Sequence, residues 1–384
     1  MKTRDRERKT LVQLLRNYPV VAIVGARQVG KSTLAGLIAS SWKRSVEQFD
    51  LENEIDLARL ADPMRALQPL RGLVVLDEIQ YAPEFFRVLR VLADRPRTPA
   101  RFLILGSASP ALLRQSSESL AGRIAYRELG GFAMDETDHK DHNRLWRRGG
   151  FPRSYLARSE SQSFEWRREF VRTFLQRDLP QLGINVSAST MRRFWTMLAH
   201  YHGQVWNASE FARSFGVADT TVRAYLDHLA SALVVRQLQP WHENLSKRQV
   251  KSPCVYVKDS GLLHVLLNLP TQRDLEGHPK VGASWEGFAI EQIIRFTGAA
   301  PEECYFWATH AGAELDLLIV RGRERLGFEV KLTSAPRVTK SMRIACEDLQ
   351  LSQLDVIHAG DRTFDMAEGI RALAIADLVK SLRS

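Results

Sequence analysis

The amino-acid sequence predicts an α/β protein whose first third contains a parallel β-sheet. In this region short apolar runs alternate with segments of helical periodicity, which is the pattern of strands joined by crossover helices. A glycine-rich segment, residues 25–32, joins the first apolar run to the first helical segment. A later apolar run, Leu73–Leu76, ends in two carboxylates, at the position where a parallel sheet presents polar groups to a ligand. Together these observations indicate a P-loop (phosphate-binding loop) fold.

Five short strands are expected in this parallel sheet. They are Val20–Val24, Glu47–Asp50, Leu73–Leu76, Phe102–Leu105 and Ala125–Leu129. A polar loop over residues 135–141 follows the fifth strand and marks a domain boundary.

The glycine-rich segment 25–32 fits the phosphate-binding pattern G-x-x-x-x-G-K-[ST]. Its glycines allow backbone N–H groups to curl around phosphates, and the amino end of the following helix adds a favourable dipole. Lys31 is expected to reach the β- and γ-phosphates, and Ser32 to hold Mg²⁺. The predicted nucleotide contacts are Gly25, Ala26, Arg27, Gln28, Val29, Gly30, Lys31, Ser32 and Thr33.

The carboxylates after the third strand predict a hydrolytic site. Asp77 is expected to hold Mg²⁺ through water, and Glu78 to polarise the attacking water as a general base. The alternative is a strand that merely ends in solvated acids, and the upstream phosphate-binding loop disfavours it.

Two further residues are candidates for the same site. Ser107, after the fourth strand, is expected to touch the γ-phosphate or its water, although a serine in this position is also a common helix cap. Arg123 is a candidate arginine finger that reaches the γ-phosphate of a neighbouring subunit; in other phosphate-transfer systems such a finger supplies roughly 10³–10⁵ in rate. The alternative for Arg123 is one of many surface arginines in a basic protein.

Together these segments resemble a bacterial and archaeal family of AAA-type ATPases. The resemblance rests on G-A-R-Q-V-G-K-S at 25–32, D-E-I-Q at 77–80, L-G-S-A-S at 105–109 and L-A-G-R at 120–123. It continues with G-G-F-P at 149–152, Y-V-K-D-S-G-L at 256–262 and E-V-K at 329–331, so it spans nearly the whole chain. The resemblance implies ATP binding and hydrolysis by an AAA-type domain fused to a C-terminal domain of unknown function.

The segment 207–229 predicts a helix–turn–helix with Gly216 at the turn, and 233–238 a wing strand. In this winged helix, the exposed side of the second helix is expected to enter a DNA major groove, with Arg223 nearest to the bases. Further contacts, to DNA phosphates, are expected from Lys247, Arg248 and Lys251. Because winged helices also contact proteins, and acidic residues dilute the positive face here, a protein partner remains the alternative.

A second catalytic constellation is predicted near the C-terminus. Glu329 and Lys331 share one face of a strand, and Asp316 lies across the hairpin from them. An upstream helix offers Glu286 or Glu291 as a further carboxylate. The set resembles the PD-(D/E)xK nuclease core, in which carboxylates hold Mg²⁺ and the lysine stabilises developing charge. The alternative is a strand hairpin with a surface Glu–Lys pair, and the segment holds no strict Pro-Asp pair.

Composition bears on partners and location. The net charge of +10 favours an anionic partner such as nucleic acid. Three scattered cysteines without a C-x-x-C pair fit a reducing cytoplasm. No apolar stretch approaches the length that spans a membrane, so we expect a cytoplasmic protein with no membrane contact.

We therefore expect three domains: a P-loop AAA-type ATPase domain, a helical region with a winged helix, and an α/β restriction-endonuclease-like domain. Their expected ranges are 1–134, 135–250 and 251–384. The expected function is an ATP- and Mg²⁺-dependent ATPase, a homo-oligomer, that couples its nucleotide state to DNA binding. An ATP-regulated, metal-dependent DNA nuclease and a non-catalytic, nucleotide-gated scaffold for protein partners are the two alternatives.

Overall fold

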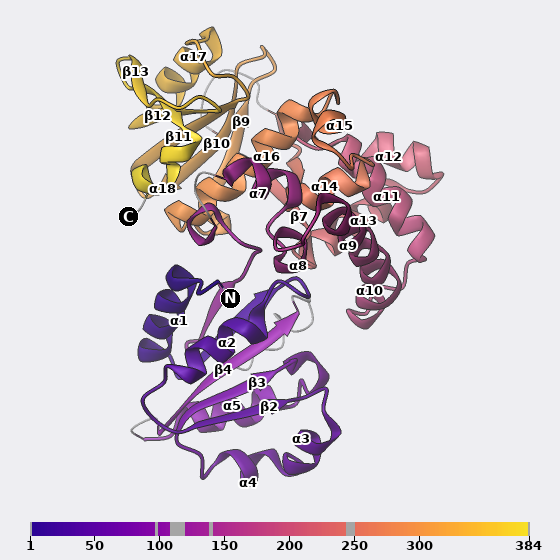
Figure 1. The fold of residues 1–384 in the computed structure, drawn as a ribbon, viewed down its shortest axis with the longest axis vertical. Helices are drawn as coiled ribbons and strands as arrows, with labels where there is room; N and C mark the ends of the chain where they lie inside the picture. Colours follow the sequence, from indigo (N-terminus) through magenta and orange to yellow (C-terminus); the bar gives the residue numbers. More distant parts are fainter. Residues whose placement is uncertain (1, 97–98, 108–119, 138–140, 243–249, 383–384) are drawn as a thin grey trace. The chain divides into compact units, whose positions relative to one another are not determined.

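The computed structural model describes residues 2–96, 99–107, 120–137, 141–242 and 250–382 (Figure 1). The chain divides into two compact units. The first comprises Met1–Phe132 with Ser231–Leu233, and the second Ala133–Ala230 with Val234–Ser384. Each unit is described by itself. In the described residues, no helix is both long and apolar enough to cross a membrane.

The first unit is built on a five-stranded parallel sheet, which confirms the predicted sheet. Its strands are β1 (Val20–Gly25), β2 (Val46–Asp50), β3 (Gly72–Asp77), β4 (Ala100–Ser107) and β5 (Ile124–Glu128), in the order β2-β3-β4-β1-β5. Every neighbouring pair runs parallel. The carboxyl ends of all five strands therefore share one edge of the sheet, where Gly25 lies opposite Ser107.

Helices cover both faces of this sheet. They are α1 (Asp5–Asn17), α2 (Lys31–Ser40), α3 (Glu54–Arg59), α4 (Pro63–Leu67) and α5 (Phe85–Ala93), with the short helix η1 (Ile79–Tyr81) after β3. Alternate residues of β1 and β3 pack with Phe86 and Leu89 of α5 in one apolar core. Helices α1 and α2 contact each other and strands β1 and β4 (Figure 1).

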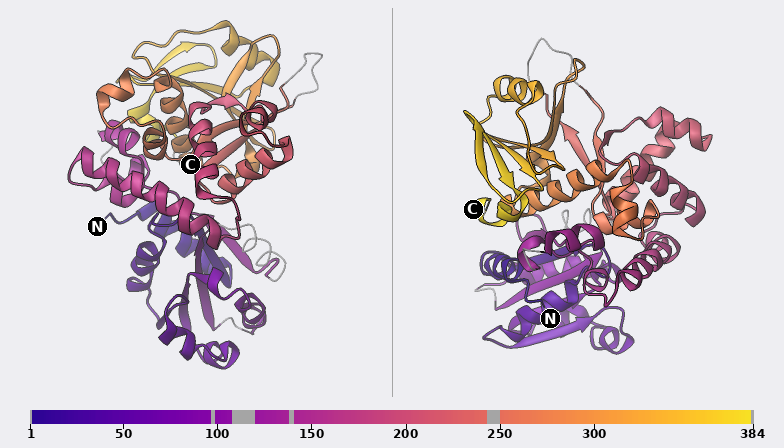
Figure 2. Two further views of the ribbon diagram at one scale, coloured as in Figure 1. Left: turned by 90° about the vertical axis from the view of Figure 1, so that its right-hand side faces the viewer. Right: turned by 45° about the horizontal axis from the view of Figure 1, so that its top comes forward.

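The second unit contains a nine-stranded mixed sheet in the order β13-β14-β12-β11-β10-β9-β7-β8-β6. The strands are β6 (Gln204–Val205), β7 (Val235–Pro240), β8 (Cys254–Val257), β9 (Cys304–Ala308), β10 (Glu314–Arg321), β11 (Glu324–Lys331), β12 (Gln353–His358), β13 (Phe364–Ala367) and β14 (Ile370–Ala374). Helix α17 (Lys340–Leu349) packs its apolar side on one face of strands β10–β12. Helix α16 (Val281–Thr297) runs along β10 and β11 (Figure 2).

The other helices of the second unit lie around the β7–β8 end of this sheet. They are α7 (His142–Arg148), α8 (Pro152–Tyr155), α9 (Glu160–Thr173), α10 (Leu179–Gln181), α11 (Ala188–His200), α12 (Ala208–Phe215), α13 (Asp219–Ser231), α14 (Ser260–Leu266) and α15 (Gln272–Glu276), and α18 (Leu378–Ser381) ends the described chain. A π-helical turn, η4 (Phe174–Asp178), joins α9 to α10. Strand β8 pairs antiparallel with both β6 and β7.

The G-G-F-P and Y-V-K-D-S-G-L segments meet at the buried carboxylate of Asp259. This carboxylate accepts the N–H groups of Gly150 at 2.7 Å and Leu262 at 2.9 Å. A Cβ atom at Gly261 would lie 2.2 Å from the Arg148 carbonyl oxygen, so only glycine allows the two segments this approach. Both segments are therefore structural: they join α7 and α8 to α14.

Two histidines of the second unit, His202 and His264, are fully buried and neutral, and each forms hydrogen bonds with both ring nitrogens. His202 Nδ1 accepts the N–H of Val257 at 3.0 Å, and its Nε2 donates to the Ala283 carbonyl at 3.1 Å. His264 Nδ1 donates to a carbonyl at 3.0 Å, and its Nε2 accepts the Ser284 hydroxyl at 2.7 Å. Burial lowers the pKa of each histidine from its usual 6.5 to about 3.

These two histidines predict acid sensitivity of the second unit. Between pH 6.5 and about 3 these two histidines are protonated in the unfolded chain but neutral in the folded unit. The free energy of unfolding therefore falls as pH falls below 6.5. We expect His202→Gln to lose roughly 2 kcal/mol less stability between pH 6.5 and 5 than the parent chain. Urea unfolding followed by tryptophan fluorescence measures this, because every tryptophan except Trp42 lies in the second unit.

The matched control is His200→Gln, since His200 is an exposed histidine at the end of α11, two residues before His202. It should keep the pH dependence of the parent chain. An equal change in both variants would contradict the assignment of the acid sensitivity to the buried ring.

Candidate nucleotide-binding site

The loop between β1 and α2 has the backbone conformation of a phosphate-binding loop. It turns twice through left-handed conformations, at Gln28 (φ 62°) and Gly30 (φ 99°). Gly30 adopts such a conformation without strain, whereas the backbone of Gln28 is strained in it. Lys31 and Ser32 then form the first turn of α2, so the amino end of this helix lies directly after the loop.

Lys31 lies buried inside this loop, with only 5 % of its surface exposed. Its ammonium donates hydrogen bonds to the carbonyl oxygens of Gly25 at 3.0 Å and Ala26 at 3.1 Å. Backbone carbonyls are weaker partners for a cation than phosphate oxygens are. The side chain can therefore exchange these contacts for an anion that enters the loop.

Ser32 and Asp77 lie side by side at the carboxyl edge of the sheet, and their side chains are hydrogen-bonded. Burial raises the pKa of Asp77, the Ser32 hydroxyl and the charge of Lys31 lower it, and the charge of Glu78 raises it further; the net direction is upward. A carboxylate in this environment gains from a nearby cation. Its oxygens and the hydroxyl are the ligand type that Mg²⁺ prefers, so the two residues fit the metal.

Glu78 is held in place by Gln80, a residue that the sequence analysis assigned no role. Glu78 has a left-handed backbone (φ 55°), and the Gln80 amide donates a hydrogen bond to its carboxylate. The other atom of that amide, Oε1, accepts the N–H of Ser107 at 3.2 Å. Gln80 thus bridges the ends of β3 and β4 and orients the expected general base. Its presence in the D-E-I-Q segment was the available signal.

Ser107 ends β4 with a buried hydroxyl. Only 5 % of the residue is exposed, and its Oγ has no hydrogen-bond partner among the described residues. An unsatisfied buried hydroxyl costs free energy unless a ligand or water completes it. The position is therefore suited to contact with a bound phosphate or its water.

Arg4 connects the phosphate-binding loop to the segment that follows β5, and no sequence motif indicated this role. Its buried guanidinium donates to the carbonyl oxygen of Val29 at 3.2 Å, and to those of Gly130 and Gly131 at 3.0 Å. Because one buried cation bonds to both segments, a movement of the loop at Val29 also disturbs the segment that leaves β5.

Arg123 lies at the opposite edge of the sheet from the phosphate-binding loop. It precedes β5, whose first residue Ile124 is opposite Val20 at the start of β1. The length of β1, about 20 Å at ~3.3 Å per residue, separates it from the loop. Its guanidinium forms a double ion pair with Asp94, at 2.6 and 3.0 Å, on the exposed surface. Arg123 is therefore remote from the phosphate-binding loop of its own chain.

The C-terminal constellation forms a cluster of carboxylates on β10, β11 and α16. Glu329 is 3 % exposed; one of its oxygens pairs with the Lys331 ammonium at 2.7 Å, and the other has no partner among the described residues. Asp316 accepts the N–H of Val330 at 2.8 Å. Burial and the charges of Glu286 and Glu329 raise the pKa of Asp316.

Helix α16 contributes Glu286 to this cluster, not Glu291. Burial raises the pKa of Glu286 to about 7, and the Tyr256 hydroxyl donates to its carboxylate at 2.6 Å. Glu291 instead forms a buried ion pair with Arg236, with a contact of 3.0 Å. In the part of the chain that the structure describes, no three His, Cys, Asp or Glu side chains are arranged to hold a metal ion.

Of the four residues expected to contact DNA, the structure describes two. Arg223 is exposed on α13 and lies over the ring of Trp206, at 5.6 Å from its centroid. Lys251 is exposed before β8, whereas Lys247 and Arg248 fall outside the described residues.

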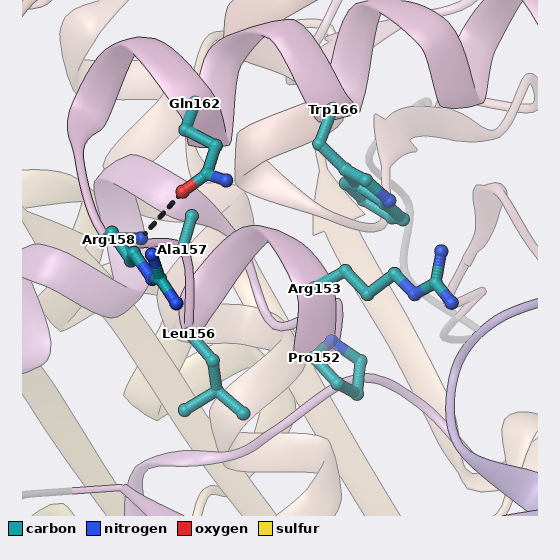
Figure 3. Close-up of a pocket in the computed structure, with 7 residues that line it drawn as sticks. All are labelled: Pro152, Arg153, Leu156, Ala157, Arg158, Gln162 and Trp166. Atoms are coloured by element: carbon teal, nitrogen blue, oxygen red, sulfur yellow. Dashed lines mark hydrogen bonds between the residues drawn. The ribbon is translucent and has the colours of Figure 1, made fainter.

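A shallow pocket of about 400 Å³ lies elsewhere in the second unit, between α8 and α9 (Figure 3). Leu156, half exposed, and Trp166 give it an apolar floor, and Arg153 lines it with its stem. Gln162 is occupied by its hydrogen bond to the Arg158 N–H at 2.9 Å. The pocket contains no carboxylate or nucleophile and is separate from the sites above.

Comparisons with known proteins divide the chain in three. Residues 17–137 match the family described as "AAA domain". Residues 139–273 and 281–378 match two families described as domains of unknown function, DUF8612 and DUF4143. The chain thus has an AAA-type ATPase domain at its amino-terminal end.

The Walker-type ATPase of Pyrococcus abyssi is similar in fold, with a TM-score of 0.50 and 15% identity over 70% of this chain and 96% of that one. The uncharacterized proteins Rv2008c of Mycobacterium tuberculosis and Mb2031c of Mycobacterium bovis are each 50% identical over 363 residues, which cover 94% of this chain and 81% of theirs. The chain therefore belongs to the family of these mycobacterial proteins.

Proposed function

We propose that this protein hydrolyses ATP in its AAA domain and couples the nucleotide state to DNA binding. The observation that carries the hydrolytic part is the set of polar side chains at the carboxyl edge of the parallel sheet. Ser32 is bonded to Asp77 there, and Gln80 links Glu78 to the backbone of Ser107. This set adjoins the phosphate-binding loop. It contains the carboxylates of Asp77 and Glu78 and the Gln80 amide that positions Glu78. It also contains the Ser107 hydroxyl, which has no hydrogen-bond partner among the described residues.

In the proposed mechanism the loop N–H groups bind the phosphates, and Lys31 moves from the Gly25 and Ala26 carbonyls to the phosphate oxygens. Ser32 and Asp77 would hold Mg²⁺, which neutralises charge on the transferred phosphoryl group. Glu78, oriented by Gln80, accepts the proton of the attacking water. The Ser107 hydroxyl donates to the γ-phosphate or to that water.

Arg123 is proposed to act on a neighbouring subunit. Arg123 lies at the edge of the sheet where the strands begin, and its side chain is on the surface. This position suits a contact with another copy of the chain and not with its own loop. The proposal therefore includes a homo-oligomer in which Asp94 releases Arg123 to a partner's γ-phosphate.

The DNA-binding part rests on the segment from α11 to β8. Two helices joined by a tight turn at Gly216 are followed by antiparallel strands β7 and β8, which is the element order of a winged helix. Arg223 is exposed on the second helix, and the net charge of +10 favours a polyanion. We take residues 135–250 as this DNA-facing region and 251–384 as the nuclease-like region.

A second candidate function, a metal-dependent DNA nuclease, is favoured by one observation. Glu329 keeps a buried oxygen without a partner in the described part of the chain, beside Asp316 and Lys331. Against it, the carboxylates do not stand in a metal-binding arrangement, and Lys331 already pairs with Glu329. Cleavage would require these side chains to rearrange.

Substitution of Lys31 and Glu78 separates nucleotide binding from hydrolysis. Lys31→Ala removes a phosphate contact and should lower both ATP affinity and turnover, the latter on the order of 10²-fold or more. Glu78→Gln should keep ATP affinity and lose turnover by about 10²–10⁴-fold, because only the base is removed. Nucleotide binding and phosphate release are measured in parallel. Lys340→Ala, an exposed lysine in the second unit, is the control; normal turnover by Lys31→Ala would refute the site.

The proposed coupling predicts that one DNA form stimulates ATP turnover. Arg223→Glu should weaken duplex binding by roughly tenfold and lower that stimulation, because it reverses a charge on the groove-facing helix. Arg168→Glu, an exposed arginine on α9, makes the same charge change elsewhere and should bind normally. If the parent chain binds no DNA even at low salt, the protein-binding scaffold is the better function.

The nuclease candidate is tested by incubating duplex, branched and single-stranded DNA with Mg²⁺ or Mn²⁺. Cleavage is expected to disappear in Asp316→Asn and in Glu329→Gln, and to persist in the control Glu324→Gln, an exposed residue of the same hairpin. Cleavage that survives both cluster substitutions, or no cleavage of any substrate, rules the site out.

A further inference from the structure

A basic groove of about 860 Å³ lies in the first unit, where α1 passes the end of α2 and the starts of β3 and β4. None of the described residues that line it is acidic. Its basic lining residues are Arg8, Lys9, Arg16, Lys43, Arg44 and Arg101. Trp42, Val12 and Pro99 add apolar surface between these cations.

The positive charges of this groove are largely uncompensated. Of the six, only Arg8 forms an ion pair with a described residue, a 3.3 Å contact to the exposed Asp5. The Arg101 guanidinium donates to the Arg16 carbonyl at 3.1 Å, which leaves its charge unpaired. Burial and the charge of Arg44 lower the pKa of Arg101. The cations therefore repel one another, and a bound anion would relieve that repulsion.

Stabilisation of helix ends explains only part of the cluster. Arg16 lies in the last turn of α1, and Lys43 and Arg44 follow the end of α2, where cations interact favourably with the helix dipole. Arg8 and Lys9 lie in the amino-terminal half of α1, where the dipole disfavours cations, and Arg101 belongs to a strand. Their convergence on one groove needs a different reason.

We infer that this groove binds a single strand of nucleic acid, with its phosphates on the cations and a base on Trp42. A concave surface lined by several cations and an aromatic ring matches the way proteins hold single strands without reading sequence.

The groove lies at the opposite end of α2 from the phosphate-binding loop. This helix begins at Lys31 and ends at Ser40, with Trp42, Lys43 and Arg44 directly after it, so the two sites are about 15 Å apart along one rigid element. The inference deepens the proposed coupling to nucleic acid and rests on that proposal for the class of partner. It assigns the contact to the ATPase unit itself.

Fluorescence anisotropy with a labelled oligothymidylate tests the groove in the full-length chain. Lys43→Glu with Arg44→Glu should weaken binding by roughly tenfold or more, and should flatten the slope of log affinity against log salt by about 1.4 for two lost phosphate contacts. Trp42→Ala should weaken binding without changing that slope, because stacking is independent of salt. Trp42→Phe keeps an aromatic ring and should therefore restore the binding affinity.

The matched control is Arg65→Glu with Arg87→Glu, two exposed arginines of α4 and α5 in the same unit, which should bind as the parent does. Equal losses in both double variants would overturn the groove, since only total charge would then matter. Loss confined to Arg223→Glu would also overturn it and leave the winged-helix proposal standing. Stronger binding of anionic lipid vesicles than of oligothymidylate, abolished by the groove substitutions, would replace nucleic acid by a membrane as the ligand.

Discussion

The parallel pairing of β1 with β4 determines where every side chain of the proposed nucleotide site lies. In this register Gly25 is opposite Ser107, and β3 continues the same direction on the far side of β4. The loop, the carboxylates and the hydroxyl therefore share one edge, although about 80 residues of chain separate Gly25 from Ser107. A sheet with one antiparallel strand here would carry one of these groups to the opposite edge.

The edge of this sheet where the strands begin carries mainly positive charge. Arg123 precedes β5, and the basic groove opens at the starts of β3 and β4, so cations gather where the strands begin. Carboxylates and the buried Lys31 occupy the edge where the strands end. This separation keeps the like charges of the groove away from the phosphate-binding loop. Within this unit it also places Arg123 and the nucleic-acid groove away from the nucleotide that the same chain would bind.

Two buried polar side chains that join distant segments of this protein are well hydrogen-bonded. Arg4 satisfies three carbonyls, and Asp259 accepts two backbone N–H groups. Buried atoms without a partner in the described residues include Ser107 Oγ and Glu329 Oε2 in the two proposed sites, and also several indole nitrogens and other side-chain atoms outside them. An unsatisfied buried atom costs free energy, so these atoms support the two sites only together with the neighbouring loop and carboxylates. The same reasoning explains why the G-G-F-P and D-S-G segments, prominent in the sequence, are structural.

The sequence by itself determined the parallel sheet, the phosphate-binding loop and the strands that end in Asp77 and Ser107, because apolar alternation and glycine placement are local signals. It left Glu286 and Glu291 as equal alternatives, since both lie on one helix about 140° apart. Tertiary structure decided between them: Arg236 of β7, distant in sequence, neutralises Glu291 and leaves Glu286 beside Asp316. The roles of Arg4 and Gln80 and the convergence of α1, α2 and β4 on one groove likewise come from tertiary structure alone. Contacts between distant residues depend on the three-dimensional path of the chain, and no local pattern encodes that path.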